Sequence, residues 1–143
     1  MAKAKMNVTE LESFLHLEFP QAFNNDDISI ESADGATSLL RQRYSERMLR
    51  PGGTVSGPTL MALADFAMYV VLLSAIGPVG LAVTTNLNIN FLRKGLPGQD
   101  VLAQARLLKL GKRLAVGEVV LLSGTSPDPI AHVTSTYSIP ITD

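Results

Sequence analysis

Asp65 is the only charged side chain between Pro51 and Leu92, and it lies inside a long apolar stretch. Taking a carboxylate out of water without a partner costs several kcal/mol, and no Lys, Arg or His lies nearby in the sequence to offset that cost. A desolvated carboxylate is a stronger proton acceptor, which is the property that a general base requires. Asp65 is therefore the first candidate for a catalytic residue, as a general base or as a nucleophile.

A second chemical group precedes Asp65 by two helical turns. Residues 57–76 are predicted to form a helix, with Ser56 as N-cap and Pro58 near the start, where its missing N–H costs nothing. The N–H groups at a helix N-terminus stabilise a developing negative charge, such as the oxygen of a tetrahedral intermediate. Gly57 lies about 12 Å of helix axis before Asp65, so a substrate laid along the helix could meet both groups. The alternative is that Asp65 caps another element, accepts backbone N–H bonds or emerges at the helix surface.

The remaining chain is predicted to supply strands and one short helix. Apolar and polar residues alternate over 81–92, and three further strands are expected at hairpin spacing, over 100–110, 113–123 and 129–139. A hairpin of residues 28–32 and 36–44 is expected to flank the turn Ala33-Asp34-Gly35. Asn7 and Glu10 can form a capping box for a helix that Pro20 stops, which we interpret as a docking helix and not as part of a site.

The central helix is apolar nearly all round, so it must be covered on most sides. Strands that curl around it would do this, which predicts an α+β domain. At 143 residues the chain fits one domain, with residues 1–20 as an N-terminal helix and arm and residues 28–139 as the core. A membrane span over 60–83 is the alternative. It is disfavoured by Asp65, by Gly77-Pro78 and by the alternating pattern that follows.

Composition excludes several classes of function. With 46% hydrophobic residues, 17% charged residues and a net charge of -1, the chain is neither disordered nor a basic nucleic-acid binder. The absence of cysteine excludes disulfides, zinc–thiolate sites and a cysteine nucleophile. His16 and His132 have no carboxylate at metal-like spacing, so we expect no metal site. The first residues do not resemble a secretory signal, which predicts a cytoplasmic location.

Three motifs resemble one known family. These are Ser-Gly-Pro-Thr-Leu-Met-Ala-Leu-Ala-Asp at 56–65, Asn-Ile-Asn-Phe-Leu-Arg at 88–93 and the hairpin of residues 109–113. Together they resemble the hotdog-fold thioesterases of the phenylacetate-degradation (PaaI-like) branch, over about residues 28 to 139. The resemblance implies a hotdog fold, an antiparallel sheet wrapped around one long helix, in a homodimer and a dimer of dimers. It also implies hydrolysis of an acyl-CoA thioester without a separate cofactor, because coenzyme A is part of the substrate.

The resemblance assigns roles to individual residues. By position, the N–H of Gly57 would polarise the thioester carbonyl, and Asp65 would activate water or attack directly. Thr84, supplied by the partner subunit, would position the attacking water. The chain departs from the usual His-Gly-Gly start of the helix, since Ser56 and Pro58 replace the His and the second Gly. Pro58 has no N–H and cannot be a second oxyanion donor.

Further residues are candidates for substrate binding. Arg50 stands where the family often has an asparagine or glutamine, and Ser56 takes the place of the histidine. Met61, Met68 and Tyr69 could line a pocket for an aromatic or medium-length aliphatic acyl group, although such residues at helical spacing are more often part of a core.

Four basic residues are candidates for binding the nucleotide end of coenzyme A. Arg93, Lys94, Lys112 and Arg113 fall at a strand end and in a hairpin turn, where long side chains can reach phosphates. In similar thioesterases, such positions contact coenzyme A. The alternative for each is an ordinary solvated charge.

Two other functions compete with hydrolysis. A dehydratase or hydratase on the same fold would pair a histidine with an acid, but there is no histidine between Ser56 and Asp65. A non-catalytic acyl-CoA-binding module is the other alternative, because Ser56 and Pro58 alter the start of the helix.

Overall fold

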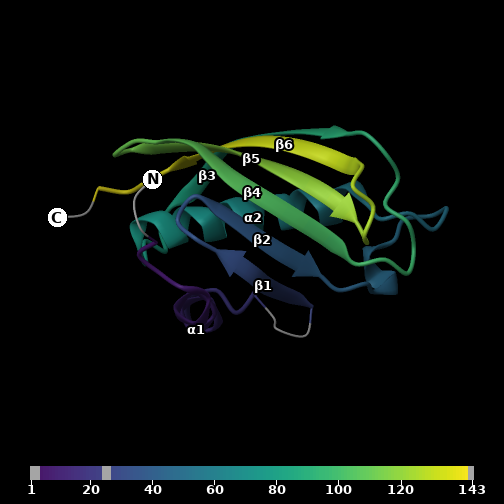
Figure 1. Cartoon of the computed structure of the whole chain (residues 1–143), viewed down its shortest axis with the longest axis horizontal. Helices are drawn as coiled ribbons and strands as arrows, with labels where there is room; N and C mark the ends of the chain where they lie inside the picture. The colour runs from purple at the N-terminus through teal and green to yellow at the C-terminus, as the bar shows by residue number, and fades with distance from the viewer. Residues whose placement is uncertain (1–3, 24–26, 142–143) are drawn as a thin grey trace.

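The computed structural model describes residues 4–23 and 27–141, which form two α-helices, one 3-10 helix and six strands (Figure 1). In chain order these are α1 (Val8–Glu18), β1 (Ile28–Ala33), β2 (Thr37–Gln42), η1 (Glu46–Met48), α2 (Gly57–Ile76), β3 (Val83–Phe91), β4 (Val101–Leu110), β5 (Leu114–Ser123) and β6 (Pro129–Ser138). The predicted helices, the hairpin and the four later strands are confirmed, with boundaries that differ by one or two residues.

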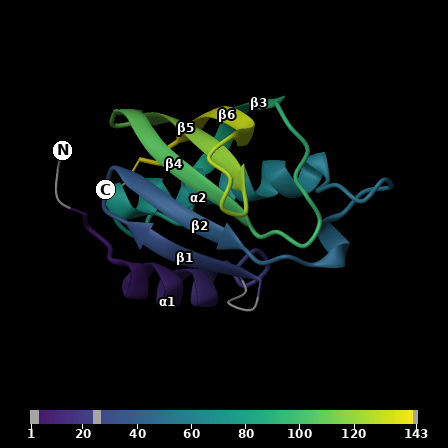
Figure 2. The ribbon, with the colours of Figure 1, turned by 45° about the vertical axis from the view of Figure 1, so that its right-hand side comes forward.

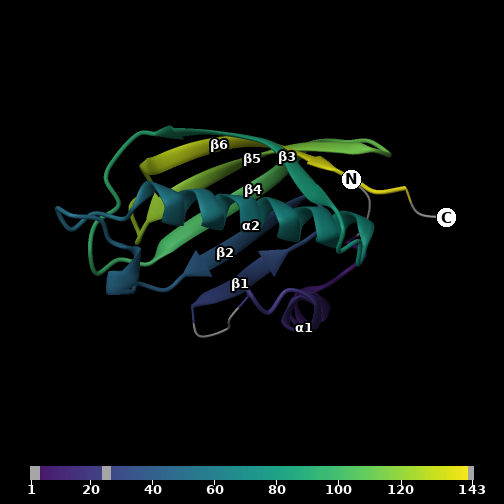
Figure 3. The same cartoon turned by 180° about the vertical axis from the view of Figure 1, so that it is seen from behind.

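All six strands form one antiparallel sheet in the order β1-β2-β4-β5-β6-β3. The predicted architecture, an α+β domain with a sheet wrapped around one long helix, is confirmed; Figure 3 shows α2 lying along the concave face of the strands. Two pairings, β2 with β4 and β3 with β6, do not follow from chain order. β3 pairs with β6 and not with β4, the next strand along the chain, because residues 92–100 cross to the other half of the sheet.

Helix α2 forms the core of the domain. Ser56 caps its start by accepting from the N–H of Thr59, and the helix ends at Gly77, whose φ of 97° favours glycine. Helix α2 is long and apolar enough to cross a membrane, but 72% of its most apolar 18-residue stretch is buried inside the fold. On β5, a Cβ at Gly117 would lie 2.5 Å from the Sδ of Met68, so a glycine allows the sheet to approach the helix this closely.

Helix α1 packs beside β1 and against α2 (Figure 2). Its predicted capping box is confirmed, since Asn7 Oδ1 accepts from the N–H of Glu10 and Glu10 accepts from the N–H of Asn7. Leu11 and Leu15 are fully buried and anchor the helix to the core. The C-terminal end of α1 therefore lies close to α2 and to the loop that follows it.

Strand β3 is an edge strand. It pairs with β6 along one side, with a bulge between Thr84 and Asn86, and its other side has no partner strand within the described chain. Val83 is 56% exposed and Phe91 is 53% exposed, so the two ends of this edge present apolar side chains to solvent. Unpaired, apolar edges of this kind are typical of strands that join a second chain.

Candidate functional site

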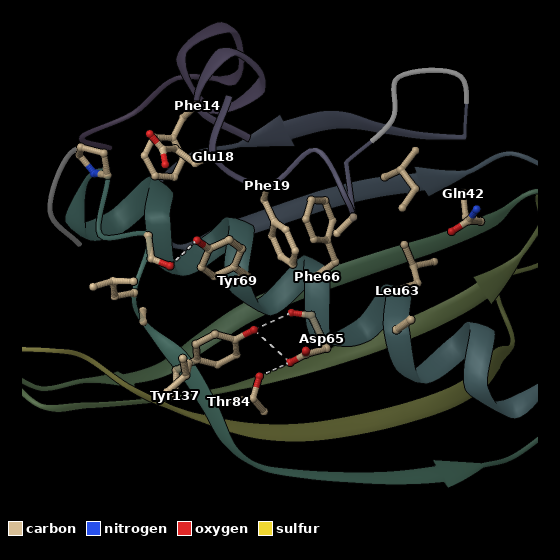
Figure 4. Close-up of a pocket in the computed structure, with 18 residues that line it drawn as sticks. Phe14, Glu18, Phe19, Gln42, Leu63, Asp65, Phe66, Tyr69, Thr84 and Tyr137 are labelled. Atoms are coloured by element: carbon tan, nitrogen blue, oxygen red, sulfur yellow. Dashed lines mark hydrogen bonds between the residues drawn. The ribbon is translucent and has the colours of Figure 1, made fainter. Parts of the chain in front are cut away.

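Two hydroxyl groups hold the carboxylate of Asp65 (Figure 4). Thr84 Oγ1 donates to Oδ1 at 2.6 Å, and Tyr137 Oη donates to the same oxygen at 3.0 Å and lies 3.1 Å from the Asp65 carbonyl oxygen. Asp65 is half-buried, so it emerges at the surface of α2 as the alternative interpretation allowed. Because both donors bind Oδ1, Oδ2 receives neither bond and is available to a water or a substrate.

The sheet register brings the two hydroxyls together. Thr84 on β3 is directly opposite Tyr137 on β6, and Tyr137 is in turn opposite Ala115 on β5. Tyr137 is 3% exposed, as expected for an inward-facing position of a strand that alternates between core and solvent. The bulge after Thr84 changes the direction of side chains along β3, so that the Thr84 hydroxyl reaches α2.

Burial keeps the Tyr137 phenol protonated. Its pKa is raised, first by desolvation and then by the negative charge of Asp65, against an opposing effect of the hydrogen bond with Thr84. A phenol that stays protonated is a permanent donor at neutral pH. The orientation of the Asp65 carboxylate is therefore fixed by two groups that do not titrate near neutrality.

A cavity of about 840 Å³ opens beside Asp65. Its walls come from α1 and the turn after it, from α2, from the loop that leads into β3 and the start of β3, and from single positions on β1, β2 and β6. They consist of aromatic residues (Phe14, Phe19, Phe66, Tyr69, Tyr137), smaller side chains and backbone (Ala22, Ile28, Ala62, Leu63, Pro78, Gly80, Leu81, Ala82, Val83) and four polar residues (Glu18, Gln42, Asp65, Thr84). A mostly apolar cavity with a few convergent polar groups is typical of a small-molecule site.

Gly57 lies at the start of α2, two turns before Asp65, and does not line this cavity. As the first residue of α2 it belongs to the turn whose N–H groups have no acceptor within the helix. A Cβ at this position would lie 3.2 Å from Phe91 Cζ, so the end of β3 covers the helix start. The separation of about 12 Å from Asp65 is too long for both residues of one chain to contact the same carbonyl group.

The prediction that Thr84 acts across a subunit boundary is wrong. Thr84 binds Asp65 of its own chain, because β3 runs alongside the α2 helix that precedes it. Thr84 and Asp65 of one chain therefore form one part of the candidate site, which we call the half-site. Gly57 lies apart from it.

The structure separates the candidates for acyl binding. Tyr69 lines the cavity, whereas Met68 does not, since it is fully buried against β5 at Gly117. The prediction that Met68 contacts substrate is therefore wrong. Met61 is 41% exposed, and Arg50 and Ser56 lie at the helix start; none of the three lines the cavity within one chain.

The four basic residues do not gather within one chain. Lys112 and Arg113 form the β4–β5 turn, at the sheet end where β3 begins, since Val83 and Leu114 are both opposite Ser138. Arg93 and Lys94 follow the far end of β3, where the guanidinium of Arg93 donates to the Pro129 carbonyl at 2.8 Å. All four side chains are exposed.

Sequence reasoning missed part of this site. Tyr137 gave no signal, because its contact with Asp65 spans 72 positions of the chain. The interpretation of residues 8–18 as a docking helix outside the site is wrong in part, since Phe14 and Glu18 line the cavity. The aromatic residue Phe14, beside the buried face of this short helix, could have indicated from the sequence that the helix lines the cavity.

A polar cluster lies on the outer face of the sheet, away from this cavity. His132 Nε2 lies 3.0 Å from Glu118 Oε2, and the guanidinium of Arg106 donates to Oε1 of the same carboxylate. The hydrogen bonds from Arg106 and then His132 lower the pKa of Glu118. Over residues 4–23 and 27–141, no three His, Cys, Asp or Glu side chains come together as a metal site.

Comparisons with known proteins agree with this fold. Residues 52–129 match the family model of the thioesterase superfamily. The chain is 30% identical over 122 residues to a proposed esterase of Saccharolobus solfataricus, covering 85% of this chain and 78% of that protein.

Several solved structures are also similar to this chain. A proposed thioesterase from Silicibacter sp. TM1040 shares 44% identity, with a TM-score of 0.87 over 96% of this chain and 94% of that one. Zebrafish thioesterase superfamily member 2 is similar in fold at 20% identity, with a TM-score of 0.82 over 95% of this chain and 100% of that one. The PaaI protein from the phenylacetic acid degradation operon of E. coli is similar in fold at 22% identity, with a TM-score of 0.71 over 91% and 90%.

Proposed function

Because the chain belongs to the thioesterase superfamily, with the hotdog fold, we propose that it hydrolyses an acyl-CoA thioester to a free acid and coenzyme A. The observation that carries the proposal is the Asp65 carboxylate, held by Thr84 and Tyr137 on the wall of a cavity of about 840 Å³. A carboxylate with one fixed oxygen and one available oxygen, beside a mostly apolar cavity, suits hydrolysis of an acyl group bound there.

In the proposed mechanism, Oδ2 of Asp65 takes a proton from a water molecule as that water attacks the thioester carbonyl carbon. The carbonyl oxygen becomes an oxyanion, and the carbon–sulfur bond then breaks as the thiolate leaves and takes up the proton. Thr84 and Tyr137 bind Oδ1 throughout, so they keep Oδ2 directed at the water. The oxyanion needs a donor that this half-site does not contain.

A second copy of the chain supplies that donor in our proposal. The unpaired edge of β3 can join the same edge of a second copy in an antiparallel, two-fold arrangement. A two-fold axis near Leu87, the middle of β3, places the Phe91 end of one strand beside the Thr84 end of the other. Phe91 contacts Gly57, so the Gly57 N–H of the second copy approaches Asp65 of the first. Each dimer then has two sites, and either chain alone has none.

The same pairing gathers the basic residues. Lys112 and Arg113 lie at the Thr84 end of β3, and Arg93 and Lys94 lie at the Phe91 end. The two-fold axis therefore places Arg93 and Lys94 of the second copy beside Lys112 and Arg113 of the first. Four cations near the mouth of each site would attract the phosphates of coenzyme A.

Release of free thiol from a panel of acyl-CoA thioesters tests the proposed function. Hydrolysis releases thiol, whereas a hydratase does not, and a binding module binds acyl-CoA without either reaction. We expect Asp65→Asn to lower kcat by about 100-fold to 10,000-fold and to retain acyl-CoA binding, because only the proton acceptor is lost.

Asp128→Asn is the matched control, since it makes the same chemical change in an exposed loop. Equal thiol release by wild type and Asp65→Asn would remove Asp65 from the mechanism. Absence of thiol release by the wild-type protein from every thioester in the panel would contradict the proposed function itself.

A further inference from the structure

The cavity beside Asp65 has one end that is aromatic and acidic. Its rings form a continuous series: Tyr137 stacks on Tyr69 at 6.1 Å between centroids, and Phe19 lies 6.0 Å from Tyr69 and 6.2 Å from Phe66. Tyr137 also binds Asp65, so this wall begins at the reactive carboxylate and continues to the segment after α1. An acyl group whose carbonyl lies at Asp65 can therefore follow it.

Glu18 lies at the far end of this wall, as Figure 4 shows, beside Phe14 and on the opposite side from Gln42. Its charge is close enough to Tyr69 to add to the effect of burial in raising the pKa of that phenol. Phe14 packs at the same end, since its Cζ would lie 3.2 Å from a Cβ at Gly80, whose carbonyl accepts from the Tyr69 hydroxyl at 2.9 Å.

The charges along the cavity have one sign. Its described lining contains two carboxylates, Asp65 and Glu18, and no Lys, Arg or His side chain. A negatively charged group inside would meet two like charges and no cation, which is unfavourable in a partly desolvated space. The four basic residues assigned to coenzyme A lie at the ends of β3, and α1 lies beside β1 at the opposite edge of the sheet. The nucleotide and the acyl group therefore leave Asp65 in different directions.

We propose that Glu18 and the aromatic wall from Tyr137 to Phe19 select uncharged, apolar acyl groups and reject acyl groups that end in a carboxylate. This inference rests on the proposed thioesterase function and names its substrate class. Glu18 is exposed, so water and salt screen its charge. The discrimination due to Glu18 alone is on the order of tenfold, and it decreases as ionic strength rises.

The experiment compares two acyl groups of equal length that differ in terminal charge. Octanoyl-CoA and its counterpart with a terminal carboxylate are assayed for kcat/KM, and the matching thioether analogues, which cannot be hydrolysed, are titrated calorimetrically. We expect wild type to prefer the neutral member of both pairs, and Glu18→Gln to reduce that preference about tenfold, mainly through KM and the dissociation constant.

Two further variants control for the stability of α1 and for the direction in which the acyl group runs through the cavity. Glu12→Gln makes the same change on α1 outside the cavity and is expected to leave the preference unchanged. Gln42→Glu adds a carboxylate at the opposite end. If Gln42→Glu strengthens the preference and Glu18→Gln does not reduce it, the acyl group runs the other way and the proposal is wrong.

The thioether titrations separate this inference from the function on which it rests. Selective binding that depends on Glu18, without thiol release from either ester, would support the selectivity and contradict the thioesterase function. Hydrolysis of both esters with a preference that Glu18→Gln leaves unchanged would support the thioesterase function and contradict the selectivity due to Glu18. Failure of both thioethers to bind would overturn the proposal, because the cavity would then not be the acyl site.

Discussion

The phenol of Tyr137 lies 3.0 Å from Oδ1 of Asp65, although the two residues are 72 positions apart in the chain. This contact joins β6, the last strand along the chain, to the central helix at the carboxylate that we propose as the general base. It also uses the oxygen that Thr84 binds, so two neighbouring strands fix one carboxylate from the same side. We infer that Tyr137 is a positioning residue, which acts through Asp65.

Replacing the phenol tests this role. Tyr137→Phe keeps the ring and its packing but removes one donor, so the Asp65 carboxylate is held by Thr84 alone. We expect kcat to fall about tenfold to a hundredfold, with KM for acyl-CoA changed by less than about twofold. Steady-state kinetics of thiol release measure both parameters, and Tyr44→Phe, which removes a phenol outside the cavity, is the control.

A double-mutant cycle with Thr84→Ala distinguishes positioning from a general loss of stability. Because both donors bind one oxygen, the second removal is expected to cost less than the first, and the combined loss in kcat is smaller than the product of the single losses. Multiplicative losses would mean that Tyr137 and Thr84 act independently.

Mixed dimers test which chain contributes Gly57. Gly57→Pro removes the N–H at the first helical position, and Ser56 already has a ψ of 149°, which suits a following proline. When a Gly57→Pro chain is combined with an Asp65→Asn chain, one site of the dimer recovers both native residues. We expect activity of about half the wild-type value in the isolated, doubly tagged heterodimer.

Two comparisons make the mixed-dimer result specific. Gly57→Ala retains the N–H while adding a Cβ near Phe91, so it is the control for crowding. A dimer of Asp65→Asn and Thr84→Ala chains should show no rescue, because those two residues serve the same half-site. Recovery in that second dimer, without recovery in the first, would mean that Thr84 comes from the other chain and that Gly57 comes from the same chain as Asp65.

The β4–β5 turn is expected to affect affinity for the nucleotide. Replacing Lys112 and Arg113 by alanine should raise KM for acyl-CoA about fivefold to tenfold, more at low salt than at high salt, with little change in kcat. An acyl-pantetheine thioester, which lacks the nucleotide, should respond much less. An equal response of both substrates would show that these side chains do not contact the phosphates.

Burial of Tyr137 predicts a loss of stability at alkaline pH. Its pKa in the folded protein is raised above the ordinary value of 10.0, so the unfolded chain loses this proton first. The stabilising contribution is complete below about pH 10 and decreases above it, by roughly 1 kcal/mol at pH 11. Denaturant unfolding at pH 8 and pH 11 should show this decrease in wild type and not in Tyr137→Phe, whereas the raised pKa of Tyr69 affects both proteins alike.

The sequence predicted what depends on local pattern. The helix of residues 57–76 follows from its apolar run, from Ser56 before it and from Gly77 after it, and its bounds are as expected. Asp65 was identifiable because a lone charge in an apolar helix requires partners. The partners themselves were not predictable, since β3 pairs with β6, the last strand along the chain, and not with β4, and only this register places Thr84 opposite Tyr137.

The error over Met68 has a related cause. Periodicity shows which residues share a helix face, but an all-round apolar helix does not reveal which face the sheet covers. The sheet covers the Met68 side, and the cavity lies on the side of Phe66 and Tyr69.

The wrapping of α2 also sets an order of events during synthesis. The helix is complete at Ile76, but β4, β5 and β6, which cover it, extend to Ser138. At about 5 to 20 residues per second, a ribosome needs roughly 3 to 12 seconds to add those strands. During that interval a strongly apolar helix has been synthesised without most of its cover, which makes the nascent chain a candidate for chaperone binding. Pauses in translation after the helix would lengthen this exposure, and pauses after β6 would not.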